Sequence, residues 1–127
     1  MRLRSFTAFV SLLLVASCNV LPTTCTLIGC VDGVNVTFSR PLAAPFRVEA
    51  LVQGSNPVVV DCPTANSCPG LSSAFLAVVA DEMTIRVTTP SGTVTQQVSP
   101  RYEAVYPNGR SCGAGCEQAE VTITLPG

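Results

Sequence analysis

Apolar and polar residues alternate along three segments of this chain. Val34, Val36 and Phe38 interleave with polar residues, and the same period of two recurs over residues 46–53 and 120–125. Successive side chains of a strand point to opposite faces of a sheet. Each segment therefore predicts a strand with one face in a core and the other in water.

Five further short runs rich in Val, Ile, Thr and Phe also predict strands, which brings the expected total to eight. They cover residues 58–62, 74–80, 83–89, 93–98 and 102–106. Pro90-Ser91-Gly92 predicts a tight hairpin turn between two of them, with the glycine supplying a positive φ. Residues 74–80 suit a helix in composition, but ten prolines, nine glycines and a length of seven residues favour a buried strand.

Turn residues separate these runs at intervals of about eight to twelve positions, which is typical of β-sandwiches and barrels. We therefore expect an all-β fold, a single small antiparallel β-sandwich over residues 27–127 that disulfides staple. It is Ig-like in architecture alone, because the chain has no tryptophan to form the central pin of antibody domains. Residues 18–26, which include Pro22, are expected to form a short tether before the domain.

The first apolar stretch has the layout of a secretory signal peptide, expected to cover residues 1–17. Arg2 and Arg4 precede the apolar residues 6–16, and small residues follow. Eleven residues would rise only about 16 Å as a helix, against a hydrocarbon core of about 30 Å, so a membrane-spanning helix is not expected. The alternative, a buried core helix, is disfavoured by the two arginines in front of it.

Charge excludes nucleic acid as a partner. Removal of residues 1–17 leaves five arginines against eight acidic residues, a net charge of −3, and the arginines are scattered singly along the chain. Binding to a phosphate backbone requires clustered Lys or Arg.

The chain has neither histidine nor lysine, which removes most catalytic machinery. Ser–His–Asp and Cys–His sites need an imidazole, and Schiff-base, Ser–Lys and P-loop chemistry need a lysine. Only carboxylates remain, and two of them can meet in space from anywhere in a sequence. We predict no catalytic residue, no cofactor and no metal, and expect a non-catalytic protein. The alternative is a small secreted carboxylate-dependent hydrolase or carbohydrate-acting domain.

Seven cysteines in an exported chain leave one over when the others pair. Cys18 is that one, because Val15-Ala16-Ser17-Cys18 resembles the lipobox of bacterial lipoproteins, with Val15 and Ser17 as permitted variants. The resemblance implies a diacylglycerol thioether on Cys18, cleavage before it, and acylation of the new amine by a fatty acid such as palmitate. Two or more chains hold a protein on a bilayer, whereas one does so only marginally. The alternative is ordinary signal-peptidase cleavage, which would leave a soluble protein with a spare thiol.

The other six cysteines are expected to form disulfides, as even counts do in an oxidising compartment. They lie in three short groups, "CTLIGC", "CPTANSC" and "CGAGC", at Cys25, Cys30, Cys62, Cys68, Cys112 and Cys116. Zinc binding is the disfavoured alternative, because no group has the two-residue gap of zinc knuckles and no histidine is present. Cys62–Cys68 is expected as a local pair. The remaining four either pair locally, which we favour, or link the first strand region to the last; fifteen pairings are open in principle.

The ending of the chain resembles that of small exported bacterial proteins and lipoproteins. It combines Pro-Asn-Gly at residues 107–109, a bend at Cys112–Cys116 and a terminal alternating strand. The resemblance implies no activity. Together these features predict a monomeric lipoprotein of the bacterial cell envelope, held by the lipid on Cys18, with an unknown protein or glycan partner. Its candidate recognition loops are residues 40–45, 62–70 and 107–112.

Three other motifs favour structural roles. Asn35-Val36-Thr37 has the pattern of a glycosylation acceptor, which is used only on a eukaryotic secretory path and is interpreted here as part of a strand. Asp32-Gly33-Val34-Asn35 lacks the spaced acids of calcium loops and predicts a turn. Asp81-Glu82 predicts a solvated bend between two strands.

Overall fold

The computed structural model describes residue 25 and residues 28–68 and 70–127. The expected signal peptide (residues 1–17), Cys18 and all of the expected tether except Cys25 lie outside the described residues. The described part consists of eight strands and two 3₁₀ turns: β1 (Gly33–Phe38), β2 (Phe46–Leu51), β3 (Val58–Cys62), η1 (Ala65–Ser67), β4 (Ser73–Leu76), β5 (Met83–Thr89), β6 (Gly92–Val98), β7 (Glu103–Val105), η2 (Arg110–Cys112) and β8 (Cys116–Ile123).

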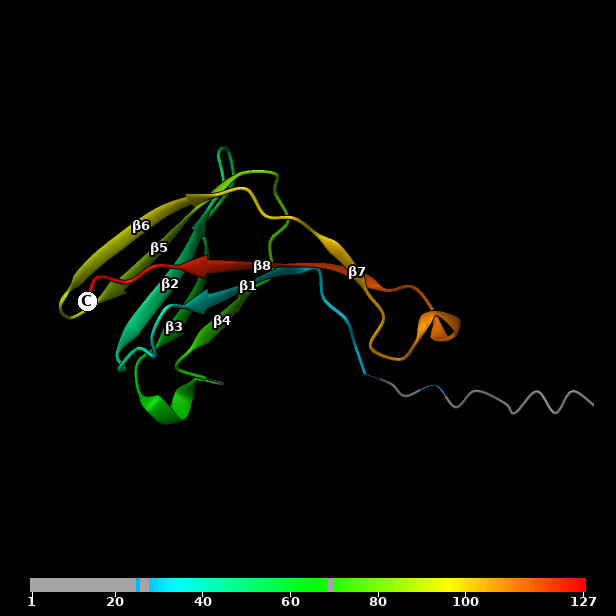
Figure 1. Cartoon of the computed structure of the whole chain (residues 1–127), viewed down its shortest axis with the longest axis horizontal. Coiled ribbons are helices and arrows are strands. Elements are labelled where there is room, and N and C mark those ends of the chain that lie inside the picture. Colours follow the sequence, from blue (N-terminus) through cyan, green and yellow to red (C-terminus); the bar gives the residue numbers. More distant parts are fainter. Residues whose placement is uncertain (1–24, 26–27, 69) are drawn as a thin grey trace, which may run out of the picture.

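The strands form two four-stranded sheets, which confirms the predicted sandwich (Figure 1). One sheet has the order β4-β1-β8-β7 and the other the order β3-β2-β5-β6. The pairing is antiparallel except between β1 and β8, which run parallel with Val36 opposite Val121. The predicted antiparallel sandwich is thus confirmed, with β1 and β8 as its one parallel pair among the described strands. These two strands stand at opposite ends of the domain sequence, so no hairpin constrains their relative direction.

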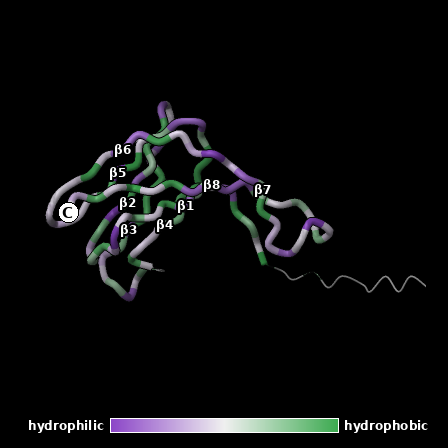
Figure 2. Tube along the Cα trace, viewed as in Figure 1, coloured by the Kyte–Doolittle hydropathy of each residue, from purple (hydrophilic) through white to green (hydrophobic). Residues whose placement is uncertain are grey.

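The inward faces of both sheets form one core, and period two selects its members as predicted. Val34 and Val36 of β1 are fully buried, as are Val48 of β2 and Val87 of β5. Phe38 and Phe46 meet edge to face, with ring centroids 5.9 Å apart and an interplanar angle of 80°. Apolar residues accordingly gather along the strands in Figure 2, while polar residues dominate several of the connections.

The hairpin between β5 and β6 follows the prediction. Thr89 pairs with Gly92, whose φ of 144° is the positive value that the turn requires. The expected strand over residues 74–80 is shorter than predicted, because β4 ends at Leu76. The rest of that run leads towards β5 of the other sheet. On the way, Tyr102, in the connection between β6 and β7, donates its hydroxyl to the Ala80 carbonyl and accepts from the Ala80 N–H, both at 3.0 Å.

Candidate functional site

The disulfides differ from the local pairing that we expected for four of the six cysteines. Cys25 is bonded to Cys112 and Cys30 to Cys116, across separations of 87 and 86 residues, so the local pairs Cys25–Cys30 and Cys112–Cys116 are wrong. The parallel register explains this, because Gly33 of β1 lies opposite Gln118 of β8. The segments that precede the two strands therefore run side by side. Cys62–Cys68 is the expected local pair, six residues apart.

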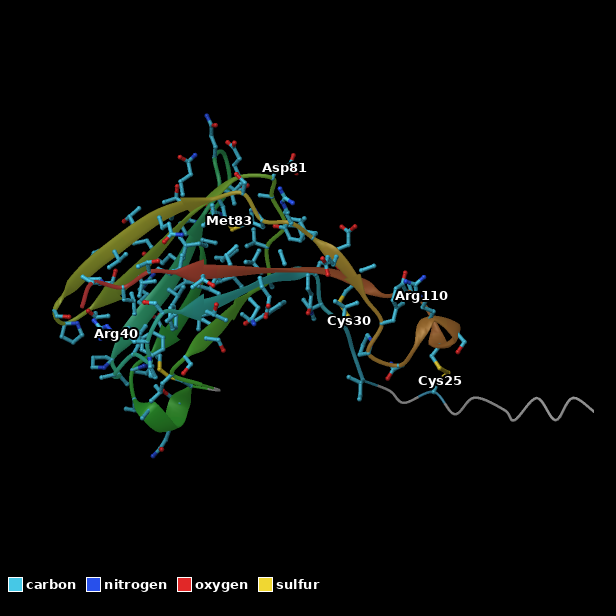
Figure 3. The ribbon with its side chains drawn as sticks, in the orientation of Figure 1. Cys25, Cys30, Arg40, Asp81, Met83 and Arg110 are labelled. Atoms are coloured by element: carbon cyan, nitrogen blue, oxygen red, sulfur yellow. A yellow bond between two sulfur atoms is a disulfide. The ribbon has the colours of Figure 1, made fainter. Side chains whose placement is uncertain are left out.

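Cys25–Cys112 joins the first described residue to the loop between β7 and β8, and Cys30–Cys116 joins the segment before β1 to the first residue of β8. We call this part, residues 25, 28–31 and 106–115, the disulfide arm; it projects from the sandwich (Figures 1 and 3). Three hydrogen bonds reinforce it and its base. Asn108 Nδ2 donates to the Ile28 carbonyl at 2.9 Å, Gln118 Nε2 donates to the Val31 carbonyl at 2.9 Å, and Asp32 Oδ1 accepts from the Glu117 N–H at 2.7 Å.

All six described cysteines are thus paired with one another, so this part of the chain contains no free thiol. It also holds no group of three or more His, Cys, Asp or Glu side chains that could bind a metal ion. Nor does any helix among the described residues have the length and apolar character needed to cross a membrane.

An ion cluster of four residues joins β2, β3 and β5 of the β3-β2-β5-β6 sheet. Glu49 of β2 is only 7% exposed and accepts a 2.6 Å hydrogen bond from Arg86 Nε on β5. Arg47 Nε lies 3.4 Å from the second oxygen of Glu49, and Arg47 Nη1 lies 3.6 Å from Asp61 Oδ1. The hydrogen bond from Arg86 lowers the pKa of Glu49 despite the opposing effect of burial. The cluster holds Glu49 ionised and braces neighbouring strands.

The outer face of the other sheet carries a concave surface of about 550 Å³. We call it the acidic face, and its lining includes Asn35, Phe75, Arg101, Glu103, Gln118 and Glu120. Asn35 Nδ2 donates to Glu120 Oε1 at 3.2 Å. Glu103 lies opposite Gln118 in the register, so Glu103 and Glu120 are diagonal neighbours, with Cα atoms about 7–8 Å apart. Both glutamates are exposed.

Phe75 shapes one side of the acidic face because it lies over a glycine. Its ring atom Cζ would be 2.6 Å from a Cβ placed on Gly33, and the Leu76 carbonyl oxygen also occupies that space. The absence of a side chain at Gly33 therefore lets the ring settle on β1, where 37% of Phe75 remains exposed. Sequence reasoning missed this platform, although a glycine at the start of an alternating strand is a signal for such a close approach.

The three expected recognition loops lie in different places. Arg40 and residues 42–44 of the first loop line an inter-sheet crevice of about 390 Å³, where Arg40 Nη2 donates to the Pro126 carbonyl at 2.8 Å. The second loop is described at residues 62–68 and at Gly70. Its disulfide, Cys62–Cys68, closes residues 62–68 into a small ring. Residues 107–112 belong to the disulfide arm. Figure 3 shows Arg40 and Arg110 at opposite ends of the molecule, so these loops form no single site.

The minor motifs take part in local contacts. Asn35 and Thr37 lie in β1, and Thr37 Oγ1 donates to the Val121 carbonyl at 3.2 Å. The turn predicted at residues 32–35 is wrong, because β1 begins at Gly33; Asp32 precedes the strand and accepts from the Glu117 N–H. Asp81 and Glu82 are exposed in the bend before β5.

Comparisons with protein-family models, with curated proteins and with solved structures gave no match to this chain.

Proposed function

We propose that the chain is a bacterial envelope lipoprotein. A lipid on Cys18 anchors it to a membrane, and the disulfide-stapled sandwich is a non-catalytic structural or binding domain. The observation that carries the proposal is the cysteine pairing, because the six described cysteines are bonded only to one another. No described thiol is left to pair with Cys18. The lipobox resemblance of residues 15–18 gives this seventh thiol a chemical role.

The disulfides also support an oxidising destination. Such bonds persist outside the cytoplasm and are rare within it. Export agrees with the signal-peptide layout of residues 1–17, and two or three acyl chains on Cys18 would then hold the exported domain at a bilayer.

The distribution of acids favours support or binding over catalysis. Without histidine or lysine, proton transfer would fall to carboxylates. Glu49, the buried acid of the described part, is held ionised by Arg86 and Arg47 and is not free to exchange a proton. A general acid needs an environment that keeps it protonated near neutral pH, whereas Glu103 and Glu120 are exposed.

Intact mass spectrometry of protein extracted from the membrane fraction tests the proposal. We expect a mature chain that begins at Cys18 and carries a diacylglycerol adduct, with a further acyl chain where the amine is modified. The adduct should map to the N-terminal peptide after proteolysis. A soluble chain with an unmodified Cys18 thiol, or a mixed disulfide between Cys18 and another cysteine, would overturn it.

The acidic face favours one second candidate, a carbohydrate-acting domain. It places two glutamates, Glu103 and Glu120, on one concave surface, and two-carboxylate glycoside hydrolysis requires such a pair. The exposed ring of Phe75 beside Asn35 and Glu120 combines a flat apolar surface with hydrogen-bonding groups, as sugar recognition requires.

An assay for new reducing ends with cellotetraose and chitotetraose tests this candidate. A hydrolase would be supported if the wild-type protein cleaves a substrate and Glu103→Gln and Glu120→Gln each abolish this turnover. The matched variant Glu82→Gln, on the β4–β5 bend, should retain it. Binding of an oligosaccharide that Phe75→Ala weakens, without turnover, would support a non-catalytic binding domain. If the protein neither binds nor cleaves these oligosaccharides, the second candidate is rejected, and the lipoprotein proposal is unaffected.

A further inference from the structure

The disulfide arm differs in charge from the rest of the domain. Residues 25, 28–31 and 106–115 contain no acidic residue and one cation, Arg110, whereas all eight acids of the chain lie elsewhere. Two acids border the arm: Asp32, whose carboxylate accepts from the Glu117 N–H, and Glu117 itself, which is exposed. The arm therefore has a charge of +1 in a mature chain of −3. An anionic surface would attract this part and repel the remainder.

The arm also exposes apolar and interfacial side chains. Of the four large apolar residues that are exposed in the described part, two lie here, Ile28 at 60% and Val31 at 55%. The Arg110 guanidinium lies 5.1 Å from the centroid of the Tyr106 ring. Tyrosine and arginine are suited to the boundary of a bilayer, since each combines an apolar body with a polar end.

The arm is held rigidly. The disulfide Cys25–Cys112 and the hydrogen bond from Asn108 to Ile28 join its two segments, and Cys30–Cys116 ties its base to β8. The Tyr106 ring packs over Gly115, where an added Cβ would lie 2.9 Å from two ring atoms. A fixed arrangement of this kind loses little conformational freedom when it binds a surface.

The length of chain before Cys25 places the arm near any lipid on Cys18. Seven residues lead from Cys18 to Cys25, and a fully extended chain spans at most about 3.6 Å per residue. A lipid on Cys18 therefore keeps Cys25 within about 25 Å of the bilayer surface. At this distance the arm meets lipid head groups at a high effective concentration, so a weak contact suffices to orient the domain.

We propose that the disulfide arm is a membrane-contacting foot that rests on an anionic bilayer through Ile28, Tyr106 and Arg110. This inference depends on the lipid anchor of the proposed function. It fixes an orientation, because Arg40 and its inter-sheet crevice lie at the end of the molecule opposite the arm (Figure 3). That end then points away from the membrane, where a partner can reach it.

Tryptophan fluorescence tests the foot, because the natural chain contains no tryptophan. Mature protein from Cys18 onwards is coupled at that thiol to a maleimide phospholipid in vesicles of phosphatidylcholine and phosphatidylglycerol. We expect emission from Ile28→Trp to shift to the blue and to be quenched by doxyl-labelled lipids. Ser91→Trp, in the β5–β6 hairpin at the far end, should keep the emission of an exposed tryptophan. Equal quenching at the two positions, or none at Ile28→Trp, would overturn the foot.

Charge reversal tests the electrostatic contribution. In the Ile28→Trp background, Arg110→Glu should remove the blue shift, while Arg101→Glu, the same change outside the arm, should retain it. Circular dichroism and non-reducing mass analysis establish that each variant keeps its sheets and three disulfides. A shift that survives Arg110→Glu would overturn the role of charge complementarity. Since the lipid is attached chemically, failure here is distinguishable from failure of lipidation in the cell, which the mass analysis of membrane-fraction protein reports.

Discussion

Cys30 and Cys116 lie opposite each other at the open ends of two parallel strands, with Cα atoms 5.5 Å apart and 86 residues between them in sequence. Cys25 and Cys112 repeat this relationship one step further from the sandwich, at a Cα separation of 5.4 Å. The two bonds close nearly the same long loop. Their contributions to stability are therefore expected to be coupled.

Removing either long-range disulfide leaves the other to close the long loop. On the loop-entropy model, each single removal then opens only a ring of about ten residues and costs about 2.5 kcal/mol. Removing both also releases the long loop, for a total of about 7 kcal/mol. The Cys25→Ala/Cys112→Ala and Cys30→Ala/Cys116→Ala proteins and the quadruple variant are compared by urea denaturation. The free energy of unfolding of the quadruple variant should fall by more than the sum of the decreases in the two double variants.

The matched control for this coupling is the local bond. Cys62→Ala/Cys68→Ala opens a separate short loop and should cost about 2 kcal/mol, added independently to either long-range removal. Simple additivity between the two long-range pairs would contradict the nested arrangement.

The sandwich could be predicted because its strands and turns are determined by residues that are neighbours in the sequence. Alternation at Val34, Val36 and Phe38 selects a buried face, and Pro90-Ser91-Gly92 sets a hairpin, so strands and the β5–β6 turn follow from neighbouring residues. The pairing of Cys25 with Cys112 depends instead on the parallel contact between the first and last strands, and no pattern of neighbouring residues predicts that contact. The similar spacing of the two cysteines within "CTLIGC" and within "CGAGC" was the available signal. When two such segments lie side by side in parallel, the first cysteine of one can bond to the first of the other, and the second to the second.

The candidate surfaces were less accessible to sequence reasoning for the same physical reason. The acidic face joins Phe75 of β4 to Asn35, Glu103 and Glu120 of three other strands, and only the register brings them together. The ion cluster likewise depends on Arg86 facing Glu49 across two strands. Residues 40–45 and 107–112 were correctly expected in connections, but their separation to opposite ends of the molecule follows from topology.

Replacing Gly33 by alanine should destabilise the domain. The added Cβ would collide with the Phe75 ring, at 2.6 Å from Cζ, and with the Leu76 carbonyl oxygen of the adjacent strand. Overpacking of this kind costs about 1–3 kcal/mol. Thermal unfolding of Gly33→Ala measures the loss, and Gly29→Ala, where no atom lies within 4 Å of the new Cβ, is the control. Equal midpoints for the two variants would show that Phe75 does not rest on Gly33.

The Glu49 cluster should make stability depend on pH in one direction. Its arginine partners lower the pKa of Glu49 in the folded protein below the ordinary value of 4.5, so its stabilisation is present above that value. The contribution is lost as pH falls through the lowered pKa of the folded state. Glu49→Gln should cost about 1.5–3 kcal/mol at neutral pH, the range for a hydrogen bond to a charged group, and progressively less in acid.

Urea denaturation of wild type and Glu49→Gln at a series of pH values between about 7 and 3 measures this difference. Glu82→Gln makes the same change of charge at an exposed bend and should leave stability nearly unchanged at neutral pH. A loss in Glu49→Gln that stays constant across the series would contradict the role of the ionised carboxylate.

Anchoring and folding should separate cleanly between Cys18 and the other cysteines. Because the described disulfides involve only the other six, Cys18→Ala should move the protein from the membrane to the soluble fraction without lowering its melting temperature. Cys62→Ala/Cys68→Ala should do the reverse, remaining in the membrane fraction while melting earlier. Fractionation by ultracentrifugation and calorimetry of the two purified proteins measure both properties. A marked loss of stability in Cys18→Ala would mean that this thiol is bonded within the domain, since a lipid outside the core contributes nothing to the packing of β1 to β8.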